Sequence, residues 1–333
     1  MGEAEIVEVS GREVRVTSPE KLVFPGPGIT KLDLVRYYLS VGEGAVRGAR
    51  DRPVILHRYP HGVEGDDFYQ KRVQKGDADW LRTARITFPS GRTAEELVLA
   101  DEAHLAWMVN LGCIDVNPWP VRADDLDHPD ELRVDLDPTP GIPFAHVRDV
   151  ALLVREVLDE HGLTGYVKTS GKRGIHVVVR IEPRWSFTGV RRAALALARE
   201  VERRDDRATT AWWKEERTGV FVDYNQNARD RTVASAYSAR PVPDARVSAP
   251  LAWEEVPDVE PEELTVATVP DRYREIGDPH EGIDEVAGSL DALLELAGRD
   301  EREGLGDAPW PPHFPKGDDE PVRAAPSRRR KRP

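Results

Sequence analysis

The sequence has a single cysteine, Cys113, and no long apolar run. One thiol excludes an intramolecular disulfide and a cysteine-rich zinc site, and its apolar setting at residues 109–114 predicts burial with a structural role. A membrane-spanning helix needs about 18 to 20 consecutive apolar residues, which the chain lacks. Glu3 and Glu5 stand where a signal peptide has basic and apolar regions. We therefore expect a cytoplasmic protein with no membrane partner.

The chain also lacks an excess of positive charge. Its 333 residues include 47 basic and 60 acidic side chains, for a net charge of -13. This balance excludes a protein that coats DNA through its overall charge. A nucleic-acid partner must be held by local basic segments, which lie at residues 71–72, 168–173, 184–192 and 328–332. Any one of these runs taken alone is more typical of an ordinary solvated face.

The apolar pattern predicts a chain that mixes helices and strands. Strands are expected at residues 6–16, as a pair that turns at Gly11, and at 54–59, 97–99, 132–137, 166–169, 175–181 and 220–224. Helices are expected at residues 30–39, with Thr30 as the N-cap, and at 147–158 and 188–203. Beyond residue 298 the chain is rich in Pro, Gly and charge, which predicts a disordered basic tail over residues 299–333.

Two aspartates, Asp135 and Asp137, are separated by one residue in an expected strand. Because strand side chains alternate between faces, both carboxylates project the same way and repel one another unless a cation lies between them. Hard oxygen ligands suit Mg²⁺ or Mn²⁺, and Asp223 can complete the site if its strand lies beside the first. Solvated acids at a strand end are the simpler explanation of an Asp-x-Asp pair alone.

Other acidic residues compete for this role. Four aspartates lie in a loop with His128 and Pro129, where turn formation and solvation are expected: Asp124, Asp125, Asp127 and Asp130. A strand fixes a ligand more rigidly than a loop does, which favours Asp135 and Asp137.

The segment Ser-Gly-Lys-Arg-Gly-Ile-His, residues 170–176, places two glycines, a hydroxyl and two cations in a turn between strands. Glycines let backbone N–H groups approach an oxyanion, while Lys172, Arg173 and His176 can neutralise a triphosphate. The spacing is not that of a P-loop, and a strand rather than a helix follows. A basic hairpin turn with a solvated histidine explains the segment equally well by itself.

The order of the motifs is more specific than any one of them. Asp-x-Asp is followed by Ser-Gly-Lys-Arg-Gly-Ile-His, then Val-Phe-Val-Asp-Tyr-Asn-Gln-Asn, then Ala-Tyr-Ser-Ala-Arg-Pro. In this order the sequence resembles the polymerase domain of bacterial DNA ligase D, in the archaeo-eukaryotic primase superfamily, from about residue 17 to 255. Residues 309–315 are also similar to the ends of stand-alone versions of that domain.

The resemblance implies roles for individual residues. The catalytic acids that bind two divalent metal ions match Asp135, Asp137 and Asp223. Residues that contact the phosphates of the incoming nucleotide match Ser170, Lys172, Arg173, His176 and Arg240. Lys21 and Lys31 resemble lysines that hold the 5′-phosphate of a recessed or gapped DNA end. Phe68 and Tyr69 resemble an aromatic pair that stacks on the template.

One position departs from the pattern of the family. Many members linked to a ligase carry a histidine where this chain has Asn117, also expected near the nucleotide. Asparagine can donate a hydrogen bond but cannot titrate, so a proton-linked role there is in doubt.

The resemblance further implies an α+β fold with a central, mainly antiparallel sheet flanked by helices. We expect a primase-polymerase domain at residues 1–298, with an N-terminal lobe at about 1–125 that contacts DNA and a catalytic core at about 126–298. The chain carries no ligase segment, so Ku and a separate ligase are expected as partners in trans, within the nucleoid.

The predicted activity is the addition of nucleotides, with ribonucleotides favoured over deoxyribonucleotides, to DNA 3′ ends in non-homologous end joining, through two Mn²⁺ or Mg²⁺ ions. Two alternatives stay open at this point. A Mn²⁺-dependent glycosyltransferase also uses an Asp-x-Asp strand end, against a nucleotide-sugar diphosphate. A DNA-end-binding module without catalysis would use the same acids only structurally.

Overall fold

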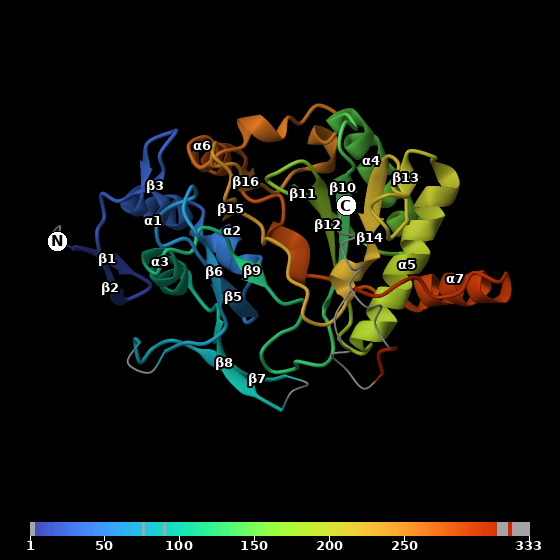
Figure 1. The fold of residues 1–333 in the computed structure, drawn as a ribbon, viewed down its shortest axis with the longest axis horizontal. Coiled ribbons are helices and arrows are strands. Elements are labelled where there is room, and N and C mark those ends of the chain that lie inside the picture. The colour runs from blue at the N-terminus through green and yellow to red at the C-terminus, as the bar shows by residue number, and fades with distance from the viewer. Residues whose placement is uncertain (1–3, 75–76, 89–90, 312–318, 322–333) are drawn as a thin grey trace, which may run out of the picture.

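Two five-stranded sheets organise the computed structural model, which describes residues 4–74, 77–88, 91–311 and 319–321 (Figure 1). The strands of the N-terminal half are β1 Glu5–Val9, β2 Arg12–Val16, β3 Leu22–Phe24, β4 Ile29–Thr30, β5 Pro53–Arg58, β6 Phe68–Gln70, β7 Thr83–Thr87, β8 Thr93–Val98 and β9 Asn117–Pro118. The later strands are β10 Glu131–Pro138, β11 Gly165–Thr169, β12 Ile175–Arg180, β13 Ala208–Thr209, β14 Val220–Asp223, β15 Ser238–Ala239 and β16 Val247–Ser248. The helices are α1 Lys31–Ser40, α2 Gly42–Arg47, α3 Glu102–Asn110, α4 Phe144–Glu160, α5 Phe187–Arg204, α6 Val269–Ile276 and α7 Asp291–Arg302.

The N-terminal half follows the sequence pattern closely. Strands β1 and β2 form the expected hairpin, and Gly11 takes a φ of 69° at its turn. Helix α1 begins after Thr30, whose hydroxyl accepts a hydrogen bond from the backbone N–H of Asp33 in a capping box. The sheet has the order β6-β5-β8-β7, with β9 paired to β5. Cys113 is buried, as expected.

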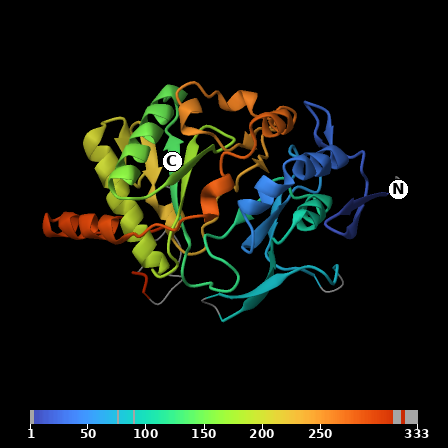
Figure 2. The same cartoon turned by 180° about the vertical axis from the view of Figure 1, so that it is seen from behind.

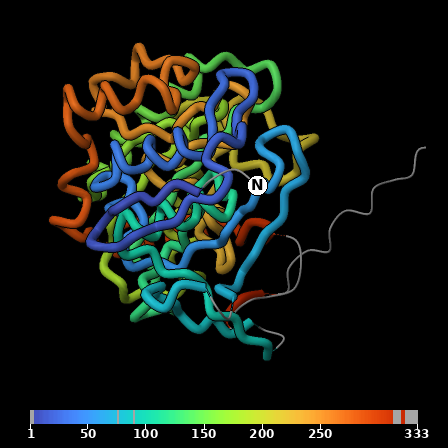
Figure 3. The backbone as a smooth tube through the Cα atoms, turned by 90° about the vertical axis from the view of Figure 1, so that its left-hand side faces the viewer, coloured from blue at the N-terminus to red at the C-terminus, as the bar shows by residue number. Residues whose placement is uncertain are grey.

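The core of this half also receives residues from much later in the chain. Apolar side chains of α1, α2 and α3 pack with Ala239, Val247, Ala249 and Val269 in one buried cluster. In the views of Figures 1 and 3, α6 and the segment around it lie beside the N-terminal helices. The N-terminal half is therefore completed by a returning segment, residues 236–269.

The second sheet has the order β11-β12-β10-β14-β13 and is antiparallel except for the β13–β14 pair. Leu132, Val134 and Leu136 of β10 pack with apolar residues of α4 and α5. These two helices cover the face of the sheet that is turned away from the N-terminal half, as Figures 1 and 2 show. Asp135 lies on the opposite face, toward the N-terminal half. The expected α+β architecture is confirmed.

Two expectations need correction. The boundary placed at residue 298 falls inside α7, whose apolar residues Leu293, Leu296 and Ala297 join the second core. Ordered structure continues beyond this helix, because Trp310 is only 4% exposed. The basic run at residues 328–332 lies outside the described residues.

The second correction concerns Asp130, which the sequence placed on a solvated turn. Its carboxylate is buried and forms ion pairs with Arg52, Arg122 and Arg180. Three guanidinium groups around one acid compensate for its removal from water. Asp125 does form the expected turn, accepting hydrogen bonds from the N–H groups of Asp127 and His128.

Across the described ranges of the chain, the helices are too short or too polar to span a bilayer.

Candidate active site

Four polar side chains form a row across the second sheet. In the strand register Lys168 lies opposite His176, His176 opposite Asp135, and Asp135 opposite Asp223. Directly opposed residues of antiparallel strands share one face, so all four side chains project toward the N-terminal half. The Lys168 Nζ to His176 Nδ1 distance is 2.6 Å, and the His176 Nε2 to Asp135 Oδ1 distance is 3.4 Å.

The structure brings the three predicted catalytic acids together. Asp137 lies two residues beyond Asp135 and therefore on the same face, while Asp223 sits across the ladder. The Gln226 side-chain amide donates hydrogen bonds to Asp135 Oδ2 at 3.2 Å and to Asp223 Oδ2 at 3.0 Å. Burial and the charge of Asp135 raise the pKa of Asp223 to about 7, and the same two causes raise the pKa of Asp137.

The donor chemistry of this group fits a hard divalent cation. Three carboxylates on one face repel one another, and after burial the charge of Asp135 is the second cause that raises the pKa of Asp137 and Asp223. A cation between the acids would relieve that repulsion. Within the part of the chain that the structure describes, no three His, Cys, Asp or Glu side chains are already arranged around a metal position. The Gln226 amide lies between two of the acids instead.

Lys168 is a site residue that the sequence did not single out. It is buried, and its ammonium donates to the Ala234 carbonyl oxygen and to Ser248 Oγ, both at 2.7 Å, besides contacting His176 Nδ1. Burial and the charge of Lys168 lower the pKa of His176 to about 4. The lowered pKa favours the neutral imidazole, whose Nδ1 faces Lys168 and whose Nε2 faces Asp135.

The glycine-bounded turn packs against Arg240. Gly171 has a φ of 67°, and a Cβ built there would lie 2.3 Å from Arg240 Cγ, so the close approach requires glycine. Ser170 Oγ accepts hydrogen bonds from the backbone N–H groups of Lys172 and Gly174. Two N–H groups of the turn, which the sequence led us to expect as donors to an anion, are therefore bonded to Ser170.

The cations of this turn remain near the acids. Lys172 and Arg173 are exposed. Partial desolvation and the charge of Arg240 lower the pKa of Lys172, while the charge of Arg173 partly offsets the raised pKa of Asp137. Cationic side chains thus border the three aspartates on one side.

Arg240 has donors that the surrounding residues do not use. Its side chain is 13% exposed, and its Nη1 lies 3.9 Å from Asp115 Oδ2. Within the described residues, Arg240 Nε and Nη1 are buried without a hydrogen-bond partner. Buried guanidinium donors without partners are energetically unfavourable, so this geometry favours an anionic ligand beside Arg240.

Asn117 reaches this region indirectly. It forms a side-chain hydrogen bond with Asp115, a buried acid that also lies 3.4 Å from His57 Nδ1. The sequence did not identify Asp115 as a site residue, because its contacts join distant parts of the chain.

Lys21 and Lys31 line one pocket of about 190 Å³ together with Arg58. Lys31 Nζ donates to the carbonyl oxygens of Thr17 at 2.6 Å and Asn110 at 3.1 Å, and Lys21 Nζ contacts the carbonyl oxygen of Pro60. Burial and the charges of Lys21 and Arg58 lower the pKa of Lys31. None of the described residues that line this cationic pocket is acidic, which suits an anionic ligand.

The predicted aromatic pair is exposed rather than part of a core. Phe68 is 45% and Tyr69 63% exposed. The Tyr69 ring stacks on His57 with centroids 4.2 Å apart, and the Arg58 guanidinium lies 5.2 Å from the Phe68 ring centroid. These contacts hold both rings in place at the surface.

Comparison with known proteins gives consistent results. The chain matches the family model of the LigD primase-polymerase domain over residues 30–280. It is 33% identical over 269 residues to the multifunctional non-homologous end joining protein LigD of Mycolicibacterium smegmatis, covering 80% of this chain and 35% of that protein. It is 28% identical over 271 residues to the bifunctional non-homologous end joining protein LigD of Bacillus subtilis, covering 80% of this chain and 43% of that one.

A solved structure agrees with these relatives. The polymerase domain of Mycobacterium tuberculosis ligase D in complex with DNA matches with a TM-score of 0.77 and 29% identity, covering 83% of this chain and 99% of that one. The chain thus spans less than half the length of the curated relatives described above and nearly all of the solved polymerase domain.

Proposed function

Because the chain belongs to the LigD primase-polymerase domain family, a family of DNA-directed nucleotidyltransferases, we propose that it adds ribonucleotides to DNA 3′ ends during non-homologous end joining. The observation that supports this most is the strand register that sets Asp223 opposite Asp135, with Asp137 on the same face. The family match favours this reaction over the glycosyltransferase and the non-catalytic module that the sequence left open.

The acids would hold the metal ions on which LigD polymerase domains depend. Asp135, Asp137 and Asp223 are the proposed ligands of two Mn²⁺ or Mg²⁺ ions. When bound, such ions lower the pKa of a primer 3′-hydroxyl and offset charge on the leaving pyrophosphate. An ionised carboxylate has about four lone-pair sites, so Asp135 and Asp223 can bind a cation while they accept the hydrogen bonds of the Gln226 amide.

The residues beside the acids would bind the incoming nucleotide. Arg240 supplies two buried N–H donors to the triphosphate, and Lys172 and Arg173 add charge from the exposed turn. His176, fixed by Lys168, presents Nε2 between Asp135 and the proposed phosphate position. The Ser170 hydroxyl, whose oxygen already accepts two amides, can donate its own hydrogen. Asn117 would act on the nucleotide site indirectly, through its hydrogen bond with Asp115, whose carboxylate lies 3.9 Å from the Arg240 guanidinium.

The N-terminal half would hold the DNA. The cationic pocket with Lys21 and Lys31 is the proposed site of the 5′-phosphate at a recessed or gapped end, and Phe68 and Tyr69 offer exposed rings for template stacking. We propose that the N-terminal lobe and the catalytic core form one functional unit that continues past residue 298 through α7, and that it works in the nucleoid with Ku and a DNA ligase.

The test is primer extension on a gapped duplex with Mn²⁺ and a labelled ribonucleotide. We expect the wild-type protein to extend the primer and Asp137→Ala to lose that activity. Asp124→Ala, which removes an exposed aspartate outside the site, is the matched control and should extend normally. Absence of extension by the wild type with either Mn²⁺ or Mg²⁺ would overturn the proposal.

A further inference from the structure

Arg191 of α5 is buried under a segment far from it in sequence. The side chain is 1% exposed, and its Nε donates to Asn225 Oδ1 at 2.7 Å. Its Nη1 donates to Asp307 Oδ1 at 2.8 Å, and its Nη2 donates to the carbonyl oxygens of Ala308 at 2.8 Å and Pro309 at 3.2 Å. One guanidinium therefore joins α5, the turn after β14 and residues 307–309.

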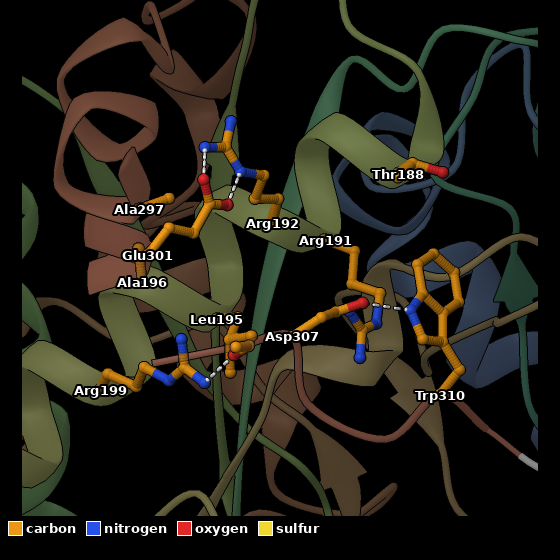
Figure 4. A pocket seen from close by; sticks show the side chains of 11 residues that line it. Thr188, Arg191, Arg192, Leu195, Ala196, Arg199, Ala297, Glu301, Asp307 and Trp310 are labelled. Atoms are coloured by element: carbon orange, nitrogen blue, oxygen red, sulfur yellow. Dashed lines mark hydrogen bonds and ion pairs between the residues drawn. The ribbon is translucent and has the colours of Figure 1, made fainter. Parts of the chain in front are cut away.

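We call residues 306–310 the strap segment. Trp310 lies over Arg191, with the guanidinium carbon 4.0 Å from the ring centroid, and its indole N–H donates to Asp307 Oδ2 at 2.7 Å (Figure 4). Arg199 Nη2 donates to the Gly306 carbonyl oxygen at 2.6 Å. A planar cation stacked on an aromatic ring and paired with a carboxylate has a well-defined orientation.

The contacts of the strap segment lead to a proposed metal ligand. Asn225 is 2% exposed and donates through Nδ2 to the Pro309 carbonyl oxygen at 3.0 Å. Its backbone N–H donates to Asp223 Oδ1 at 2.9 Å. The next residue, Gln226, bridges Asp223 and Asp135. The 3-10 turn at Tyr224–Asn227 is thus held from behind by Arg191 and the strap segment and, on its other side, fixes the Asp223 carboxylate.

The pocket of about 160 Å³ beside Arg191 does not have the properties of an anion site. Arg192 is paired with Glu301 at 2.7 Å, and Arg199 is bonded to the strap segment. In Figure 4 each of these guanidinium groups points at the carboxylate or carbonyl oxygen that accepts its hydrogen bond. Arg191 and Arg199 therefore hold the strap segment, while Arg192 is paired with α7, which supports a structural use of this region.

We propose that Arg191 and the strap segment act together as a positioning device that fixes the orientation of Asp223 and Gln226. The inference rests on the proposed function, in which Asp223 binds a divalent metal ion. The strap segment lies beyond residues 30–280, the range that matches the family model. Arg191, Asp307 and Trp310 are positioning residues, because they act on Asp223 only through Asn225.

Trp310→Ala removes the ring that covers Arg191, and Asp307→Asn weakens the ion pair with little change of shape. Trp310→Phe keeps an aromatic ring on the guanidinium but loses the indole N–H that donates to Asp307 and part of the ring area. Glu301→Gln is the matched control, because it breaks the Arg192 ion pair in the same pocket without touching Arg191 or Asn225.

The first measurement is the Mn²⁺ affinity of the full chain without DNA or nucleotide. The concentration of free Mn²⁺ is measured by electron paramagnetic resonance. Loss of groups that orient a metal ligand lowers affinity by about 10- to 100-fold in comparable sites, so we expect about a 10-fold loss for Trp310→Ala. Asp307→Asn should show a smaller loss, Trp310→Phe should retain most of the affinity, and Glu301→Gln should match the wild type.

Two further measurements separate positioning from general damage to the fold. Hydrogen exchange at the amides of residues 224–227 should become faster in Trp310→Ala and stay unchanged in Glu301→Gln. In primer extension, kcat should fall while KM for the ribonucleotide stays near the wild-type value, because Arg240 and the glycine-bounded turn do not contact the strap segment. If Trp310→Ala does not fold, Asp307→Asn and Trp310→Phe decide the outcome by the same measurements.

The possible failures are distinguishable. A wild-type chain that neither binds Mn²⁺ nor extends primers overturns the proposed function and the positioning role together. A wild type that does both, beside folded Trp310→Ala and Asp307→Asn variants with unchanged Mn²⁺ affinity and unchanged exchange at residues 224–227, overturns the positioning role alone.

Discussion

Replacing Lys31 by methionine should reduce discrimination between DNA ends with a 5′-phosphate and ends with a 5′-hydroxyl. The ammonium has three hydrogens, of which two donate to the carbonyl oxygens of Thr17 and Asn110. One hydrogen and the charge remain for a phosphate. A hydrogen bond between charged groups contributes roughly 1.5 to 3 kcal/mol, which corresponds to about 10- to 150-fold in Kd.

The assay measures four Kd values, for two proteins with two duplexes, by fluorescence anisotropy of a gapped duplex at one fixed salt concentration. Wild type and Lys31→Met are each titrated with 5′-phosphorylated and 5′-hydroxyl DNA. We expect the ratio of the two Kd values to fall by about 10-fold or more in the variant, because only the phosphorylated duplex uses the ammonium. The salt dependence of binding to phosphorylated DNA should also become shallower, by about one unit of slope.

Methionine also leaves two carbonyl oxygens without their donor, so the thermal midpoint of each protein must be measured alongside. A purely structural defect would weaken binding to both duplexes equally and leave their ratio unchanged. That result would refute the assignment of the cationic pocket to the 5′-phosphate. Lys21→Met provides a second variant, since this lysine is exposed and its loss disturbs the fold less.

Three other perturbations have defined outcomes. Arg240→Lys should raise KM for the ribonucleotide by about 10-fold, because lysine cannot supply both buried N–H donors, and an unchanged KM in steady-state extension would contradict this. Tyr69→Ala should weaken binding of a gapped duplex by about 1 to 3 kcal/mol for one stacked base, with Trp213→Ala, another exposed aromatic, as control. Burial raises the pKa of Glu96 from 4.5 to about 7. Between these two pH values the folded protein keeps a proton on Glu96 that the unfolded chain has released. The free energy of unfolding therefore falls as the pH rises from about 4.5 to 7. Glu96→Gln should therefore raise the thermal midpoint at pH 8 by an amount equivalent to roughly 3 kcal/mol or less, and should have little effect at pH 5. Equal changes of the midpoint at both pH values would exclude the charge of Glu96 as the cause.

Local patterns were enough to predict much of the fold and part of the site. The two-residue period of β10 places Asp135 and Asp137 on one face, and the capping signal at Thr30 marks the start of α1. Both depend only on residues close in sequence. The pairing of Asp135 with Asp223 depends on which strands are neighbours, and a single sequence does not encode that in its local spacing. The resemblance to a family supplied it.

Residues that act through distant contacts were missed for the same reason. Lys168 belonged to a basic run that suggested a solvated surface, yet it is buried against Ala234 and Ser248. Asp130 lay in a polar loop and is enclosed by arginines contributed by three separate segments. Gln226 stood in the motif Val-Phe-Val-Asp-Tyr-Asn-Gln-Asn but was given no role, because its bridge between two carboxylates exists only once β10 and β14 are paired.

The returning segment at residues 236–269 has a consequence for engineering this protein. A fragment cut near residue 125 would lack Ala239, Val247 and Val269, and the apolar sides of α1 and α3 would face water. Such a fragment should aggregate on expression. A chimaera that exchanges the N-terminal half between relatives must therefore carry two discontinuous stretches of sequence together, because packing couples the start of the chain to residues more than a hundred positions later.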